Sequence, residues 1–208
     1  MEQPLDFKAF FCDVLGVQDD ALLTTLADHA ALATVRKGTR LLEAGSLQSS
    51  ICFLVSGVVR CFSIDADGHE ITDCLISDPG SVLSPTADLN APAPSSVEVL
   101  SDSEIISIDL ALVGRLLKTS LAANHLYIRL LTKAWYDHFE TRRVVSQLRA
   151  KDRYLWFLDN HPDLINRVPN KYIASLLGMT PVTLSRLRAD LRGGGFSFQD
   201  QLDDVANS

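Results

Sequence analysis

The sequence predicts an α+β protein in which an antiparallel β-roll comes first and a helical part follows. Three observations predict this class. Residues 5–32 carry apolar side chains spaced three and four positions apart, as in amphipathic helices. From Ala33 onward, short β-rich runs separated by glycines replace that spacing, and after Asp109 the helical spacing returns. With 208 residues, the chain is long enough for two small domains, each with its own core.

The bulk composition is that of an ordinary globular protein, with 47% hydrophobic and 22% charged residues. No run of about 18 uncharged apolar residues is present, so no membrane span is expected. The first ten residues carry acids where a secretory signal has bases, and we therefore expect a cytoplasmic protein. None of the four cysteines forms a C-x-x-C pair, which favours buried free thiols over an iron–sulfur cluster. They are Cys12, Cys52, Cys61 and Cys74.

The N-terminal helical stretch should be interrupted at Gly16, and the strands of the roll should follow it. Residues 55–58 and 65–68 each predict a tight hairpin. The second resembles a calcium loop but lacks the remaining ligands of an EF-hand, so a simple turn is favoured. The prolines between Pro85 and Pro94 predict a loop. The β-rich runs are 35–38, 39–45, 50–57, 58–65, 70–77, 97–101 and 103–109.

Two helices are predicted after the roll, a short one over 110–117 and a long one from about 121 to 143. The long helix carries an apolar stripe larger than one small domain needs to cover a helix. Two readings stay open, a dimer seam and packing against the chain's own roll. The residues of the stripe are Ile128, Leu131, Trp135 and Phe139.

The stretch 171–191 predicts a helix-turn-helix. Its first helix directs Ile173, Ala174 and Leu177 to a core, and Gly178 stands where a helix ends with positive φ. A buried linker residue, Met179, should precede the second helix. Thr180 is an expected N-cap and Pro181 an expected first helical residue, followed by apolar Leu184 and Leu187. Asn170 is expected to cap the first helix.

The charge distribution supports a nucleic-acid-binding C-terminal part, although the net charge is −7. Residues 1–114 hold 5 Lys and Arg against 17 Asp and Glu, whereas residues 115–192 hold 14 against 6. A basic half joined to an acidic half is typical of a phosphate-binding module attached to another domain. A basic solvated helix face would give the same count.

The order of these elements resembles the Crp/Fnr family of bacterial transcription regulators over about residues 20–192. The motifs that carry the resemblance are 37–45, 51–60, 67–70 and 172–188, with Phe53 where the family has tyrosine. The resemblance implies a cyclic-nucleotide-binding-like β-roll sensor domain at 1–118, a dimerisation helix at 119–145 and a helix-turn-helix domain at 146–208. It also implies a homodimer on double-stranded DNA, with RNA polymerase and a small-molecule effector as candidate partners.

By the same resemblance, the helix 181–191 lies in the major groove and Arg186 reads a base. Arginine suits O6 and N7 of guanine, whereas Val182 could touch only a thymine methyl or a sugar. Hydroxyls near the start of a reading helix suit phosphates. Paired modules would read two half-sites. The candidate DNA contacts are Lys171, Thr180, Val182, Thr183, Ser185, Arg186 and Arg188.

Two departures from the family pattern matter. Ser84-Pro85 and Pro94-Ser95 stand where relatives that bind cyclic AMP carry Gly-Glu and an arginine, so neither cyclic AMP nor cyclic GMP is expected to bind tightly. After Leu191 the wing is short or incomplete, and the acidic tail is an expected mobile end. A pocket for another effector could be formed by Val82, Leu83, Ser84, Ser95 and Ser96.

Two alternative functions remain. One is an effector sensor that acts through protein contacts without DNA. The other is a cupin-like metal-dependent barrel enzyme, which needs inward-pointing histidine and carboxylate ligands. The roll offers only His69, beside Glu70 at a predicted turn, and no nucleophile elbow or phosphate loop is present. We therefore predict no catalytic residue and no metal ligand.

Overall fold

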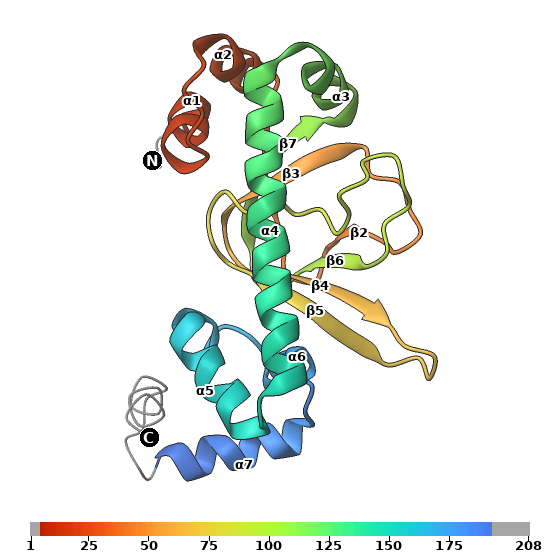
Figure 1. Cartoon of the computed structure of the whole chain (residues 1–208), viewed down its shortest axis with the longest axis vertical. Helices are drawn as coiled ribbons and strands as arrows, with labels where there is room; N and C mark the ends of the chain where they lie inside the picture. Colours follow the sequence, from red (N-terminus) through yellow and green to blue (C-terminus); the bar gives the residue numbers. More distant parts are fainter. Residues whose placement is uncertain (1–4, 193–208) are drawn as a thin grey trace. The chain divides into compact units, whose positions relative to one another are not determined.

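A computed structural model describes residues 5–192 (Figure 1). The chain forms two compact units, one of Met1–Ser63 with Leu75–Trp135, and the other of Ile64–Cys74 with Tyr136–Ser208. We call them the N-terminal unit and the C-terminal unit. The predicted α+β class is confirmed. No described helix is long and apolar enough to cross a membrane.

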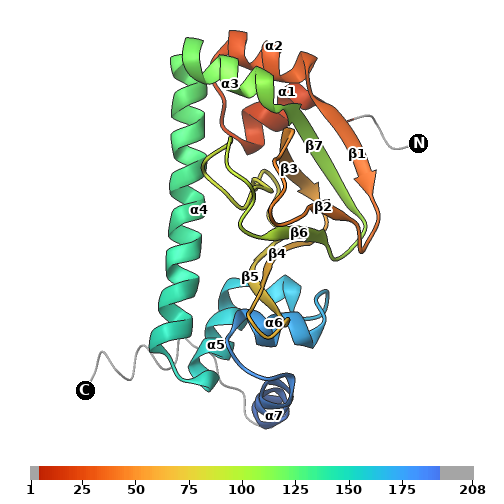
Figure 2. The ribbon, with the colours of Figure 1, turned by 90° about the vertical axis from the view of Figure 1, so that its right-hand side faces the viewer.

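Seven strands in the described residues form two sheets with antiparallel pairs. One sheet has the order β1-β7-β3, as Figure 2 shows, and the other has the order β2-β6-β4-β5. The strands are β1 (Ala31–Val35), β2 (Arg40–Leu42), β3 (Ser50–Ser56), β4 (Val59–Ile64), β5 (Glu70–Ile76), β6 (Ser96–Val99) and β7 (Ser103–Asp109).

The turn after β3 is a corner between the two sheets, so the hairpin predicted at 55–58 is wrong. β3 pairs with β7, whereas β4 pairs with β6. Gly57 makes the corner with φ 113°, and a Cβ added there would lie 1.9 Å from Oγ of Ser103. Only glycine fits this backbone conformation and this close approach. The hairpin predicted at 65–68 is confirmed, because the N–H of Asp65 donates to the carbonyl of His69 at 3.0 Å.

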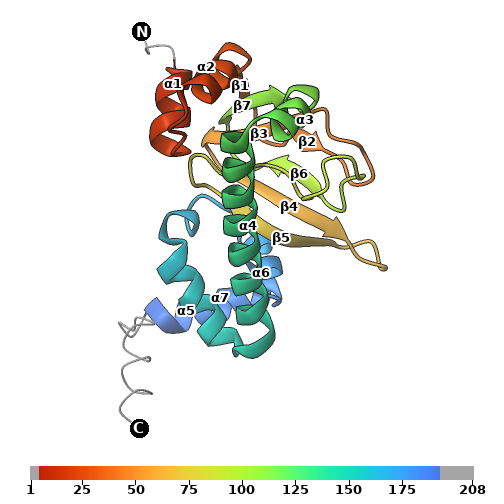
Figure 3. The same cartoon turned by 45° about the horizontal axis from the view of Figure 1, so that its top comes forward.

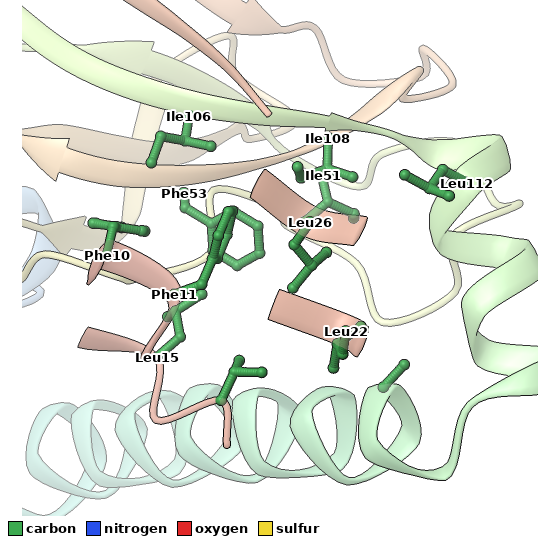
Figure 4. Close-up of a cluster of buried hydrophobic side chains, with 12 residues drawn as sticks. Phe10, Phe11, Leu15, Leu22, Leu26, Ile51, Phe53, Ile106, Ile108 and Leu112 are labelled. Atoms are coloured by element: carbon green, nitrogen blue, oxygen red, sulfur yellow. The ribbon is translucent and has the colours of Figure 1, made fainter. Parts of the chain in front are cut away.

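Helices that precede the strands in the chain, and one that follows them, cover the β1-β7-β3 sheet of the N-terminal unit (Figure 2). Phe11 stands edge-on to Phe53 of β3, with ring centroids 6.2 Å apart. Around this pair lies the buried cluster drawn in Figure 4, which joins the helices to β3 and β7. The helices are α1 (Phe7–Ala9), the π-helix η1 (Phe10–Val14), α2 (Asp20–Asp28) and α3 (Leu110–Thr119).

Aspartate side chains cap the N-termini of α2 and α3. Asp19 accepts from the N–H of Leu22 at 2.8 Å, and Asp109 accepts from the N–H of Leu112 at 3.1 Å. Gly16, with φ 64°, follows η1 as predicted. The long helix α4 (Leu121–Gln147) extends four residues beyond the predicted end.

The C-terminal unit contains α5 (Ala150–Asn160), the 3₁₀ helix η2 (Pro162–Leu164), α6 (Asn170–Leu176) and α7 (Pro181–Arg192). α7 packs against both α5 and α6 (Figure 3). Four consecutive residues of α5, 154–157, are buried and supply much of the core. The glycine run at 193–195 and the acidic tail, on which the wing prediction rests, lie outside the described residues.

Candidate nucleic-acid interface

The helix-turn-helix prediction is confirmed in its local geometry. α6 ends before Gly178, which has φ 60°, and a Cβ there would lie 3.1 Å from Cγ1 of Val145. Thr180 caps α7, since its Oγ1 accepts from the N–H of Thr183 at 3.1 Å. Pro181 is the first residue of α7, where a missing N–H has no consequence.

The inner face of the motif is the one predicted. Ile173, Ala174, Leu177 and Leu184 are fully buried, and they fix α7 against α6. Met179 is only half-buried, so its prediction as a buried linker is wrong. Burial of the inner face leaves the opposite side of α7 to solvent.

That outer face carries Val182, Ser185 and Arg186 within the first two turns of α7. Arg186 is exposed and makes no hydrogen bond or ion pair to any residue in the described range 5–192. Val182 is 60% exposed. A rigid helix therefore presents an arginine fork and an apolar side chain one turn apart.

Three of the predicted DNA contacts, Thr180, Thr183 and Arg188, have hydrogen-bond partners within the motif. Oγ1 of Thr183 lies 3.0 Å from Oγ1 of Thr180, so both hydroxyls take part in the cap. The Arg188 guanidinium donates to Oδ1 of Asn170 and ties α7 to the start of α6. The predicted capping role of Asn170 is wrong, because it is the first residue of α6 after the N-cap Pro169 and its side-chain oxygen binds Arg188.

Lys171 stands on α6 near the same motif and is exposed. Its ammonium lies 4.6 Å from the centroid of the Tyr172 ring, a cation–π distance. The stacking limits the positions that the lysine can take and leaves its charge accessible. A phosphate oxygen is the ligand that such a group suits.

The predicted effector residues are buried or half-buried in the structure. Leu83 is buried, and Oγ of Ser84 donates to Oε1 of Gln48 at 2.8 Å. Oγ of Ser96 accepts from the N–H of Ala44 at 3.0 Å. Val82 and Ser95 are half-buried. The hydroxyls of Ser84 and Ser96 are therefore engaged by the protein itself.

A cavity of about 340 Å³ lies elsewhere in the N-terminal unit, and none of the five predicted effector residues lines it. The hydroxyl of Tyr127 donates to the carbonyl of Ala87 at 2.6 Å and holds a loop against α4. Burial raises the pKa of Tyr127, and the nearby Asp88 carboxylate adds to the shift. The cavity is lined by 87–90, Leu110, Gly114, Leu117, Lys118 and Tyr127.

The apolar stripe on α4 is largely exposed. Ile128, Trp135 and Phe139 expose 58%, 59% and 50% of their surface, while Leu131 is half-buried. Every residue from 132 to 139 is exposed. Large apolar side chains in a continuous exposed stripe are typical of a protein interface.

The hairpin tip of the C-terminal unit groups Asp65, Asp67 and His69, whose ligand-type atoms lie within 4.8 Å of one another. Oδ1 of Asp65 accepts from the N–H groups of Asp67 and His69 at 2.9 and 2.8 Å. These bonds lower the pKa of Asp65, the one from His69 most. The carboxylate is thus used to close the turn, as predicted.

The chain was compared with known proteins. Residues 32–120 match the cyclic nucleotide-binding domain family. No curated protein matches the sequence. The structure is similar to FixK2 from Bradyrhizobium japonicum, with a TM-score of 0.71 and 16% identity over 80% of this chain and 86% of that one.

Two further solved structures are similar. CLP from Xanthomonas campestris, a c-di-GMP-responsive global regulator, has a TM-score of 0.68 and 16% identity over 85% of this chain and 93% of CLP. A transcriptional regulator of the Crp/Fnr family from Eubacterium rectale has a TM-score of 0.67 and 16% identity over 88% and 87%. Likeness at this level of identity establishes a shared fold.

Proposed function

From a chain that matches the cyclic nucleotide-binding domain and has the fold of Crp/Fnr-type regulators, we propose a homodimeric, sequence-specific DNA-binding regulator of transcription. α7 is the reading helix in the major groove. The observation that carries the proposal is the exposed Arg186, which no described residue engages, on a helix held in place by the buried Leu184. The proposal includes a cytoplasmic location and contact with RNA polymerase.

Arg186 supplies the base reading in this proposal. Its planar fork can donate two parallel hydrogen bonds to O6 and N7 of guanine, which is worth about 1–3 kcal/mol of discrimination. Residues near the N-terminus of a recognition helix are the ones that reach base edges, and Arg186 is the sixth residue of α7. Ser185 is exposed beside it and suits a phosphate or a base.

Dimerisation supplies the second recognition helix that the proposed DNA binding requires. A single short helix contacts few base pairs, so useful affinity requires a second copy on a second half-site. The exposed stripe of Ile128, Trp135 and Phe139 on α4 supports a parallel helix pair as the seam.

Selection of bound fragments from random DNA tests the proposal, with Arg186→Ala and Arg186→Lys as matched variants. The wild type should select one sequence containing a guanine in each half-site. Arg186→Lys keeps the charge without the fork and should retain affinity while losing most of the guanine preference. Unchanged selection by both variants contradicts the proposal and favours action through protein contacts.

We also propose that the sensor does not take cyclic AMP or cyclic GMP. A cyclic phosphate buried in the roll requires a charge-assisted partner, and Pro94-Ser95 stands where relatives that bind cyclic AMP carry the arginine. The Ser84 and Ser96 hydroxyls already have partners in the protein. Calorimetry should show no binding at low-micromolar concentrations of either nucleotide, and binding there contradicts this part of the proposal.

The cupin-like alternative gains no support from the geometry. A metal enzyme of that kind holds its ligands inside the barrel. His69 has a 75% exposed side chain at the tip of the β4–β5 hairpin. Metal analysis of the purified protein provides the direct test.

A further inference from the structure

We propose that α7 reads a thymine as well as a guanine, by contact of the Val182 side chain with the thymine 5-methyl group. The inference rests on the proposed DNA-binding function and adds a second base to it. Val182 would be the residue that sets the preference at a position about one or two base pairs from the guanine read by Arg186.

The spacing on α7 places the two side chains on one face. Val182 and Arg186 are four residues apart, and positions i and i+4 neighbour each other on a helix. Four residues rise by about 6 Å, and successive bases of one strand are about 3.4 Å apart along the duplex. The two residues therefore meet bases separated by about two steps at most.

The chemistry of the outer face narrows what this position can recognise. The Thr183 hydroxyl is engaged in the cap with Thr180, and the Arg188 guanidinium is engaged by Asn170. Both side chains therefore have a partner within the motif. Val182, 60% exposed, lies one turn before Arg186 on the outer face and has no polar atom, whereas Ser185 beside Arg186 carries a hydroxyl.

An apolar side chain distinguishes bases in the major groove by one feature. Thymine carries a 5-methyl group there beside its O4 acceptor, whereas the other three bases offer no methyl group and present donors and acceptors that valine would bury without a partner. Contact removes both apolar surfaces from water, and burial of one methyl-sized group changes an equilibrium constant about fourfold. Cytosine, adenine and guanine at the same position lose this gain.

The experiment uses the full-length protein and the half-site that the wild type selects. Each thymine is replaced singly by deoxyuridine, which keeps base pairing and removes only the methyl group, and Kd is measured at one fixed salt concentration. We expect one thymine, within about two base pairs of the Arg186-dependent guanine, at which the replacement weakens binding about fourfold. Replacement in both half-sites should weaken it about fifteenfold.

Val182→Ser identifies the side chain, because serine and valine have similar helix propensity and α7 is retained. The variant should bind thymine and deoxyuridine equally at that position and keep its guanine preference. Val182→Thr, which keeps one methyl group, should show an intermediate sensitivity. Full sensitivity to deoxyuridine in Val182→Ser overturns the assignment.

The possible outcomes distinguish a failure of the Val182–thymine contact from a failure of the proposed DNA-binding function. A wild type that is insensitive to every deoxyuridine, while Arg186→Ala still abolishes guanine preference, overturns the methyl contact and leaves the DNA-binding function intact. A protein that selects no sequence at all overturns the proposed function first.

Discussion

The N–H of Thr72 donates to Oγ of Ser175 at 2.9 Å, and that hydroxyl in turn donates to the carbonyl of Glu70 at 3.5 Å. One serine on α6 thus serves both a donor and an acceptor on β5, the last strand in the order β2-β6-β4-β5. Such an edge leaves main-chain groups without a partner strand. β5 and α6 are therefore linked within the C-terminal unit.

Ser175→Ala should destabilise this link by about 1–3 kcal/mol, because the buried N–H of Thr72 loses its acceptor. Amide exchange measured by NMR should show faster exchange at Thr72. Ser185→Ala is the matched control on α7, since Ser185 is exposed, and it should leave exchange at Thr72 unchanged. Equal protection of Thr72 in all three proteins contradicts the role of the hydroxyl.

Lys171→Ala should weaken binding to every DNA sequence by the same factor. A lysine that contacts a phosphate carries no sequence information, and its removal lowers the slope of log K against log salt by about 1. Titrations at several salt concentrations, on the selected site and on random DNA, measure both quantities. A change confined to the selected site would mean that Lys171 reaches a base.

Trp135→Ala should weaken dimerisation by about 2 kcal/mol or more, because large aromatic side chains dominate interface energies. The dissociation constant of the dimer should rise about thirtyfold or more in sedimentation equilibrium. Asp137→Ala is the control, since residue 137 stands on the other side of α4 from the stripe at 100° per residue. A wild-type protein that sediments as a monomer at all concentrations would contradict dimerisation through the apolar stripe of α4.

Gly57→Ala and Gly114→Ala should have opposite effects on the free energy of unfolding. At Gly57, φ is 113° and the added Cβ would meet Ser103, so we expect a loss of at least about 3 kcal/mol. At Gly114, inside α3, the added Cβ meets no atom within 4 Å, and alanine should stabilise by about 0.5–1 kcal/mol. Urea unfolding measures both, and a stabilising Gly57→Ala would refute the corner geometry.

Asp65 should titrate below its ordinary pKa of about 3.9, because the N–H groups of His69 and Asp67 bind its ionised form. A lowered pKa in the folded protein means that the contribution to stability is present above the unfolded pKa and is lost as pH falls through the folded pKa. Carboxyl chemical shifts followed by NMR give the pKa directly. Asp65→Asn should remove the pH dependence of amide protection at the turn.

Local chemistry accounts for the parts of the structure that the sequence predicted well. Gly178, Thr180 and Pro181 each act on the two or three residues beside them, and all three predictions are confirmed. The resemblance to Crp/Fnr regulators, drawn from short motifs, is likewise confirmed by the shared fold.

Predictions that depended on residues far apart in the chain were less accurate. The turn at Gly57 was placed correctly, but residues of β3 and β4 pair with residues 34 to 59 positions away, which local spacing does not reveal. Asn170 has the right chemistry for a cap, yet its oxygen binds Arg188, 18 positions further on. The same bond ties Arg188 to the start of α6, which spacing alone does not indicate.

The cluster around Phe11 bears on how this protein can be divided for experiments. The family match begins at residue 32, but Phe11, Leu22 and Leu26 come before it and are buried with Phe53 and Ile106. A fragment cut at the boundaries of the match would present that sheet face to water and should aggregate. Isolated fragments of the N-terminal unit should therefore begin upstream of α1.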